Sequence, residues 1–164
     1  GAKPEELSVY GAMHLVMAIV SAREGDRAGA REHIEEARRI AARQGEDRND
    51  YNTEFGPTNV ELHAVSAAVD LGDAGEAIAL AAGIDTSSLS AERQARFLID
   101  LARAHAQRRH VGDATTALLD AEQLAPEMVH GHARARETIR ELVQLTGRRA
   151  PEELTRLAQR AAAT

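Results

Sequence analysis

The sequence predicts an all-α domain in which antiparallel helix pairs stack one on the next. Apolar residues recur at helical spacing along the chain, and the short turns Gly25-Asp26 and Gly72-Asp73 separate helices in pairs. Hydrophobic residues make up 43% of the 164 residues but aromatic residues only 2%, so the core must consist of Ala, Leu, Val and Ile. Such a core suits closely packed helices and does not suit a β-sandwich.

A repeat frame fits best over residues 98–126. Its positions form two groups. The first group is Leu98, Leu101, Ala102 and His105, and the second is Ala114, Leu118, Ala121 and Pro126. These offsets are those of the tetratricopeptide repeat (TPR), a pair of antiparallel helices with small residues where they touch. We therefore expect a TPR-like right-handed superhelix of about eight helices, whose concave groove holds a peptide or a partner protein.

The first helix is expected at about 4–23 and the second at about 27–43. Pro4 suits the first turn of a helix, and Glu5 and Glu6 complement the helix dipole. Gly45 is expected to end the second helix, and a polar loop, Gly45 to Pro57, follows it.

The second pair is expected at 58–71 and 74–82, with a degenerate repeat frame and a short second helix. The third pair is expected at about 90–109 and 111–124, starting from Ser90. A helix at about 132–146 and a terminal helix at about 151–162, which caps the stack, complete the chain. We expect one domain over 1–164, with repeat units at about 5–44, 58–84 and 90–126 and terminal helices at 132–162.

Charge and composition argue against several function classes. The net charge of −6 disfavours nucleic-acid binding by this segment, and cysteine is absent, so neither a disulfide framework nor a thiolate metal site is expected. The longest apolar stretch, Leu15 to Val20, is too short to span a bilayer, and no signal peptide is visible. We expect a cytoplasmic protein, and the arginine-rich basic composition suggests a GC-rich source genome.

Three segments carry a resemblance to a known family. They are FGPTNVELHAVSAAVDLGDAGEA (55–77), ERQARFLIDLARAHAQRR (92–109) and AEQLAPE (121–127). They resemble the C-terminal TPR region of actinobacterial helix-turn-helix transcriptional regulators of the Cro/repressor class, over roughly residues 5–147. The resemblance implies that the TPR region senses a signal and dimerises, and that a DNA-binding domain not in this chain precedes it. Residues 110–113 depart from the tighter Gly-Asp turn of that family.

Two polar stripes are the candidate ligand-binding residues. The first helix of each pair lines the concave face of a TPR stack, and each stripe lies on one face of such a helix. They are Asn59, His63, Ser66 and Asp70 on the helix after Pro57, and Arg96, Asp100, Arg103 and Gln107 on the helix after Ser90. Amide and guanidinium groups can fix a peptide backbone or clamp a carboxylate. Alternatively, both stripes are ordinary solvated faces, with Asp100 flanked by Arg96 and Arg103 in an ion ladder.

The loop from Gly45 to Pro57 is a further candidate. It holds Tyr51 and Phe55, and loops of this length often carry function. We favour a packing role for Phe55, between the repeats, and assign Tyr51 and Asn52 to the candidate ligand site.

No enzyme, cofactor or metal site is expected. His130 and His132 are two residues apart and cannot share a helical face, and the chain has no H-E-x-x-H motif. His105 occupies a core position of the repeat, and His14 and His33 lie on different helices without an acidic partner at metal spacing.

Two functions remain. The first is a sensing and dimerisation domain of a transcriptional regulator that binds a peptide or small signal in its groove and forms a homodimer. The second is a stand-alone TPR scaffold that recruits a protein partner through the same groove.

Overall fold

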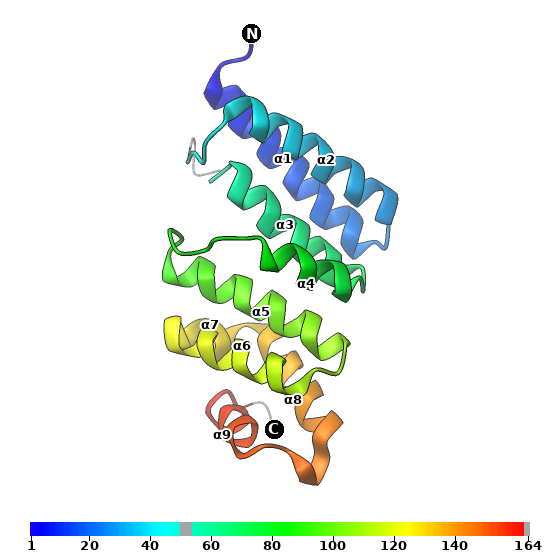
Figure 1. The fold of residues 1–164 in the computed structure, drawn as a ribbon, viewed down its shortest axis with the longest axis vertical. Helices are drawn as coiled ribbons and strands as arrows, with labels where there is room; N and C mark the ends of the chain where they lie inside the picture. Colours follow the sequence, from blue (N-terminus) through cyan, green and yellow to red (C-terminus); the bar gives the residue numbers. More distant parts are fainter. Residues whose placement is uncertain (50–53, 163–164) are drawn as a thin grey trace. The chain divides into compact units, whose positions relative to one another are not determined.

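The computed structural model describes residues 1–49 and 54–162. Over these residues the secondary structure is helical and contains no strand, and adjacent helices pack in pairs, which confirms the predicted all-α helical-repeat fold (Figure 1). The helices form two compact units, Gly1–Asp85 and Thr86–Thr164, and each unit is described by itself. In the part of the chain that the structure describes, no helix is long and apolar enough to cross a membrane.

Residues 1–49 and 54–85 of the first unit form four helices, whose bounds lie within one residue of those expected. They are α1 (Pro4–Arg23), α2 (Arg27–Gln44), α3 (Pro57–Asp70) and α4 (Ala74–Ala82). Helix α1 packs along α2, α3 packs against both, and α4 packs against α3 (Figure 1). Asp26 begins α2 by accepting a hydrogen bond from the Gly29 N–H at 2.9 Å, and Gly45 ends it in the left-handed region.

Phe55 is the anchor of the first unit's core. Its side chain is fully buried among Leu15 of α1, Ile40 of α2 and Val60 of α3, which confirms the packing role expected for it. The ring fills the space that a side chain at Gly11 of α1 would need, because a Cβ built there lies 2.2 Å from the ring atom Cζ. The aromatic residue therefore fixes which face of α1 turns inward.

The loop before α3 is held by two polar side chains. Gln44 donates from Nε2 to the carbonyl of Phe55 at 3.2 Å and to that of Glu46 at 2.8 Å. Asp47 accepts from the backbone N–H of Thr58 at 3.0 Å and from its hydroxyl at 2.7 Å, so it caps the start of α3. Tyr51 and Asn52, the loop's candidate ligand residues, lie outside the described residues.

Residues 86–162 of the second unit form one more helix than expected. They contain α5 (Ala91–Gln107), α6 (Val111–Leu124), α7 (Pro126–Gly131), α8 (Ala133–Thr146), the short 3-10 turn η2 (Gly147–Arg149) and α9 (Glu152–Arg160). The repeat frame does not predict α7, because it places Pro126 at the end of a repeat. A proline also suits the first position of a helix, and here it begins one.

Helix α9 covers one end of the second unit's core. Its Leu154 and Leu157 are fully buried with Ile139 and Leu142 of α8. Glu122 of α6 fastens it, because Arg160 reaches this carboxylate with two nitrogens, at 2.7 and 2.9 Å. His130 Nε2 of α7 lies 2.7 Å from the same carboxylate. Arg160, more than His130, holds the pKa of Glu122 below its usual value.

The chain builds the same interhelical turn three times. In each, one residue in the left-handed region follows the first helix, and the next residue's N–H closes the turn onto a carbonyl five positions earlier. These bonds join Asp26 N to Ser21 O at 2.8 Å, Asp73 N to Ala68 O at 2.8 Å and His110 N to His105 O at 2.9 Å. The third turn is therefore as tight as the other two. Helix α5 ends at Gln107, two residues before the expected end, because Arg109 takes the left-handed place that Gly25 and Gly72 hold.

Candidate functional site

The first candidate site is the outer face of α1. Six large apolar side chains there are 37% to 62% exposed to solvent. We call them the α1 apolar face: Val9, Tyr10, Met13, Val16, Met17 and Val20. Their spacing of three, four and seven residues places them on one side of the helix. They are six of the eight large hydrophobic residues that are exposed within the described chain, so this surface is concentrated on one helix.

Helix α1 is apolar on two opposite sides. Its inner face buries Gly11, Leu15 and Ala18 against the rest of the first unit, while the α1 apolar face points outward. A helix that is hydrophobic all round is normally buried all round. The repeat frame does not describe this face. The apolar series from Val9 to Val20 is the sequence signal that finds it.

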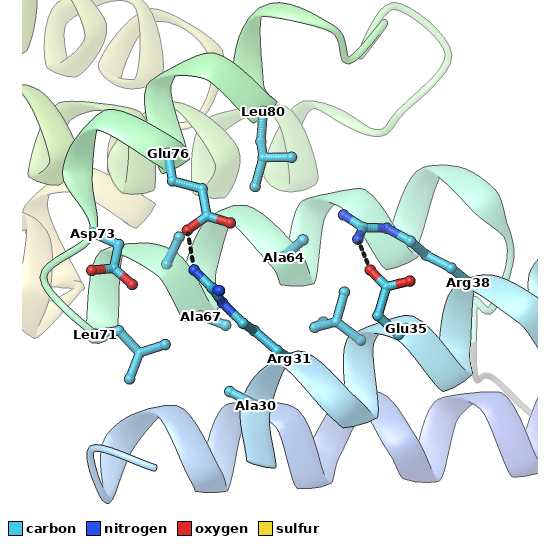
Figure 2. A pocket seen from close by; sticks show the side chains of 12 residues that line it. Ala30, Arg31, Glu35, Arg38, Ala64, Ala67, Leu71, Asp73, Glu76 and Leu80 are labelled. Atoms are coloured by element: carbon cyan, nitrogen blue, oxygen red, sulfur yellow. Dashed lines mark hydrogen bonds and ion pairs between the residues drawn. The ribbon is translucent and has the colours of Figure 1, made fainter. Parts of the chain in front are cut away.

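The second candidate site is a hollow of about 300 Å³ between α2, α3 and α4 (Figure 2). Its apolar floor consists of Ala30 and Ile34 of α2, Ala64, Ala67 and Ala68 of α3, Leu71 directly after α3, and Leu80 of α4. Its charged rim consists of Arg31, Glu35 and Arg38 of α2, Asp73 directly before α4, and Glu76 of α4.

Ion pairs already join the charged groups around this hollow. Arg31 of α2 lies 3.6 Å from Glu76 of α4, on opposite sides of the opening (Figure 2). Arg38 reaches both carboxylate oxygens of Glu61, at 2.8 and 3.0 Å, and lies 2.6 Å from Glu35. The hydrogen bonds to Glu61 are the main reason that the pKa of Arg38 is raised.

Arg27 makes the same kind of forked contact with Asp73, at 2.8 and 2.9 Å. This contact raises the pKa of Arg27 and lowers that of Asp73. A ligand that enters the hollow would have to separate Arg31 from Glu76. This exposed ion pair contributes less than about 1 kcal/mol of stabilising free energy. The hollow can therefore accept an apolar side chain of a partner with a polar end at the rim.

The first polar stripe lies on α3 but faces away from the floor of the hollow. Asn59 is buried, and its backbone carbonyl is 2.9 Å from Nδ1 of His63. The side chain of Asp70 is only 5% exposed and lies 3.9 Å from Nε of Arg23. His63 and Ser66 are half-buried. The four residues share one side of the helix as expected, but both ends of the stripe are covered.

The second polar stripe lies on α5. Arg103 donates to Asp100 at 2.9 Å, and each of these side chains is 16% exposed. Arg96 is 4.0 Å from Glu92, and Gln107 is exposed. The bond from Arg103 to Asp100 is one ion pair of the ladder that the alternative interpretation, an ordinary solvated helix face, predicts.

The second stripe also lies near the start of α8. Burial lowers the pKa of His132 there, and the positive charges of Arg96, Arg134 and Arg103 lower it further. Arg96 and Arg103 of α5 and Arg134 of α8 thus act on the same ring. Because α3 and α5 belong to different units, the groove expected between the two stripes stays a prediction.

The histidines gather in ways that helical spacing did not reveal. His14 of α1 and His33 of α2 approach through their Nδ1 atoms at 3.0 Å. His105, His110 and Asp113 meet at the turn between α5 and α6.

No family model, curated protein or solved structure matches this chain.

Proposed function

We propose that this chain is a protein-interaction domain that forms a homodimer through the α1 apolar face. In the setting that the family resemblance implies, the domain would dimerise a cytoplasmic transcriptional regulator and respond to a peptide or small signal. The observation that carries the dimer is the exposure of six large apolar side chains on one side of α1. Contiguous apolar patches of this kind mark interaction sites on proteins.

The size of the face fits a self-association surface. At 37% to 62% exposure, the six side chains present about 500 Å² together, and two copies would bury about 1,000 Å² from these residues alone. Specific interfaces begin at about this size, before the surrounding polar rim is added. Burying about 1,000 Å² of apolar surface gives a gross hydrophobic free energy of about 25 kcal/mol. This gain must exceed the cost of the translational, rotational and side-chain freedom that is lost on association.

The pattern along α1 favours a second copy in antiparallel orientation. The apolar face runs from residue 9 to residue 20, almost symmetrically about the middle of a helix that spans 4–23. A second copy therefore sets apolar residues against apolar residues along the whole face in either orientation, and the charges at the helix ends distinguish the two. An antiparallel copy places Arg23 of one copy near Glu5 of the other, whereas a parallel copy would set Glu5 and Glu6 beside the same residues of its partner.

The test is the mass of the protein in solution, measured by sedimentation equilibrium. The unmodified chain should weigh twice 17.7 kDa. Val16→Glu should dissociate it, because Val16 is 62% exposed and its burial on both copies contributes about 4 kcal/mol, or about 1,000-fold in the dissociation constant. Leu145→Glu is the matched control, since Leu145 is an exposed apolar residue on α8, and it should leave the dimer intact.

A monomer at every concentration would overturn the homodimer proposal. Equal dissociation of Val16→Glu and Leu145→Glu would overturn the assignment to α1. A monomer whose α1 apolar face captures a different protein, and loses it with Val16→Glu, would instead establish the alternative, a TPR scaffold that recruits a partner.

The proposed signal binding is tested separately. A thermal shift on addition of culture extract should disappear when Asn59 and Arg103 are substituted, provided that circular dichroism shows an intact fold. An undiminished shift would rule out the two polar stripes as the ligand site, without bearing on the dimer.

A further inference from the structure

The turn between α5 and α6 departs from the other two turns in its side chains, although its backbone is the same. The position after the left-handed residue holds Asp26 in the first turn and Asp73 in the second, but His110 in the third. The residue whose carbonyl closes the turn is Ser21, then Ala68, then His105. Both ends of the closing backbone bond therefore carry imidazole rings in this turn alone.

Two residues of this turn are unfavourable for folding at the positions they occupy. Arg109 has φ +60°, in the left-handed region where the other two turns use glycine. His110 stands at the N-cap of α6 without a side-chain capping bond, whereas Asp26 caps α2 through Gly29. Positions at which a chain gives up the better packing or capping residue are where a functional role is to be sought.

The three side chains at this turn form a set of metal ligands. His105, His110 and Asp113 each place one ligand atom so that all three lie within 4.8 Å of one another. Nδ1 of His105 is buried and has no hydrogen-bond partner among the described residues.

We propose that His105, His110 and Asp113 bind one divalent transition-metal ion of the Zn²⁺ type, with the fourth position left to water. Two imidazoles and a carboxylate are ligands that zinc takes in tetrahedral sites. The ligand atoms of such a site lie about 3.3 Å apart, so the ring of His110 and the carboxylate of Asp113 must close in by at most about 1.5 Å. Both side chains are exposed and are free to rotate that far.

The backbone of the turn holds the three ligands in register. His105 lies in the last turn of α5, and the bond from His110 N to His105 O fixes the two histidine residues across the turn. The bond from Ala114 N to His110 O starts the helix that carries Asp113. The site lies within the second unit and is independent of the α1 apolar face, so it goes beyond the proposed function.

The test is calorimetric titration of the untagged full chain with ZnCl₂ at about pH 7.5, where imidazoles are neutral. We expect one ion to bind at this turn. His110→Gln and Asp113→Asn should each weaken that binding by about tenfold or more, a loss at least as large as that on removing an outer-shell partner. Both changes are at exposed positions, and circular dichroism checks that the fold is kept.

The control variant is His33→Ala, which removes the other close histidine pair, His14 with His33. It should leave the binding at the turn unchanged. No binding of Zn²⁺ by the unmodified chain would overturn the proposal. Binding that survives both His110→Gln and Asp113→Asn, or that is lost in His33→Ala, would overturn it as well.

Discussion

Replacing Gly11 by alanine tests how α1 is seated in the first unit. In most helices this change adds about 1 kcal/mol of stability through helix propensity. Here the new Cβ would lie 2.2, 2.4 and 2.6 Å from three ring atoms of Phe55, where carbon atoms normally stay about 3.5 Å apart. Phe55 is fully buried, so the ring cannot move aside without displacing its neighbours.

The structure predicts a net loss of stability for Gly11→Ala. Overpacking of this kind costs about 3 kcal/mol, and subtracting the propensity gain of about 1 kcal/mol leaves a loss of about 2 kcal/mol. The measurement is urea unfolding followed by far-UV circular dichroism. The double variant Gly11→Ala with Phe55→Leu should be more stable than the sum of the single changes predicts, because a smaller side chain relieves the contact.

Gly112→Ala in α6 is the matched control. A Cβ at Gly112 meets no atom within 4 Å, so this variant should be neutral or up to about 1 kcal/mol more stable. If Gly11→Ala is as stable as Gly112→Ala, then Phe55 does not pack on Gly11, and the orientation that we assign to α1 is wrong.

Two further predictions concern the second unit. Arg109→Gly should raise the stability by about 1 kcal/mol, measured as a higher melting temperature, because glycine removes the penalty at φ +60°; a lower one would contradict the strained turn. Burial lowers the pKa of both His105 and His132 from the usual 6.5, so protonation favours the unfolded chain. The stability that depends on these neutral rings should be complete above about pH 6.5, and the melting temperature should fall as the pH drops below that value. Replacing His132 by Gln should make this fall at low pH less steep. An equally steep fall would argue against the contribution of His132.

Helix positions were largely predictable from the sequence because local signals mark both ends. Pro4 and Gly45 are start and stop residues with direct steric causes, and the structure uses both as expected. Asp26, expected only as a turn residue, also caps α2. Pro126 shows the limit of such signals, because the same residue can follow one helix and begin another.

The candidate sites were harder to predict because they depend on neighbours that are distant in sequence or outside helical periodicity. The hollow needs Arg31 of α2 opposite Glu76 of α4, a pairing that no local pattern contains. His105 and His110 are five residues apart, and residues at that spacing do not share a helical face. They meet only because a residue in the left-handed region, Arg109, folds the chain back between them.

The role of the α1 apolar face is tested most directly by disulfide cross-linking, because the chain has no cysteine of its own. In an antiparallel pair centred on the middle of α1, Met13 lies close to the Met13 of the second copy. Two copies of Val20 would be separated by about 20 Å along the helices, beyond the reach of a disulfide. Met13→Cys should therefore form a covalent dimer under mild oxidation, while Val20→Cys and the control Leu145→Cys should not. A Met13→Cys chain that cross-links no faster than Leu145→Cys would contradict dimerisation through α1.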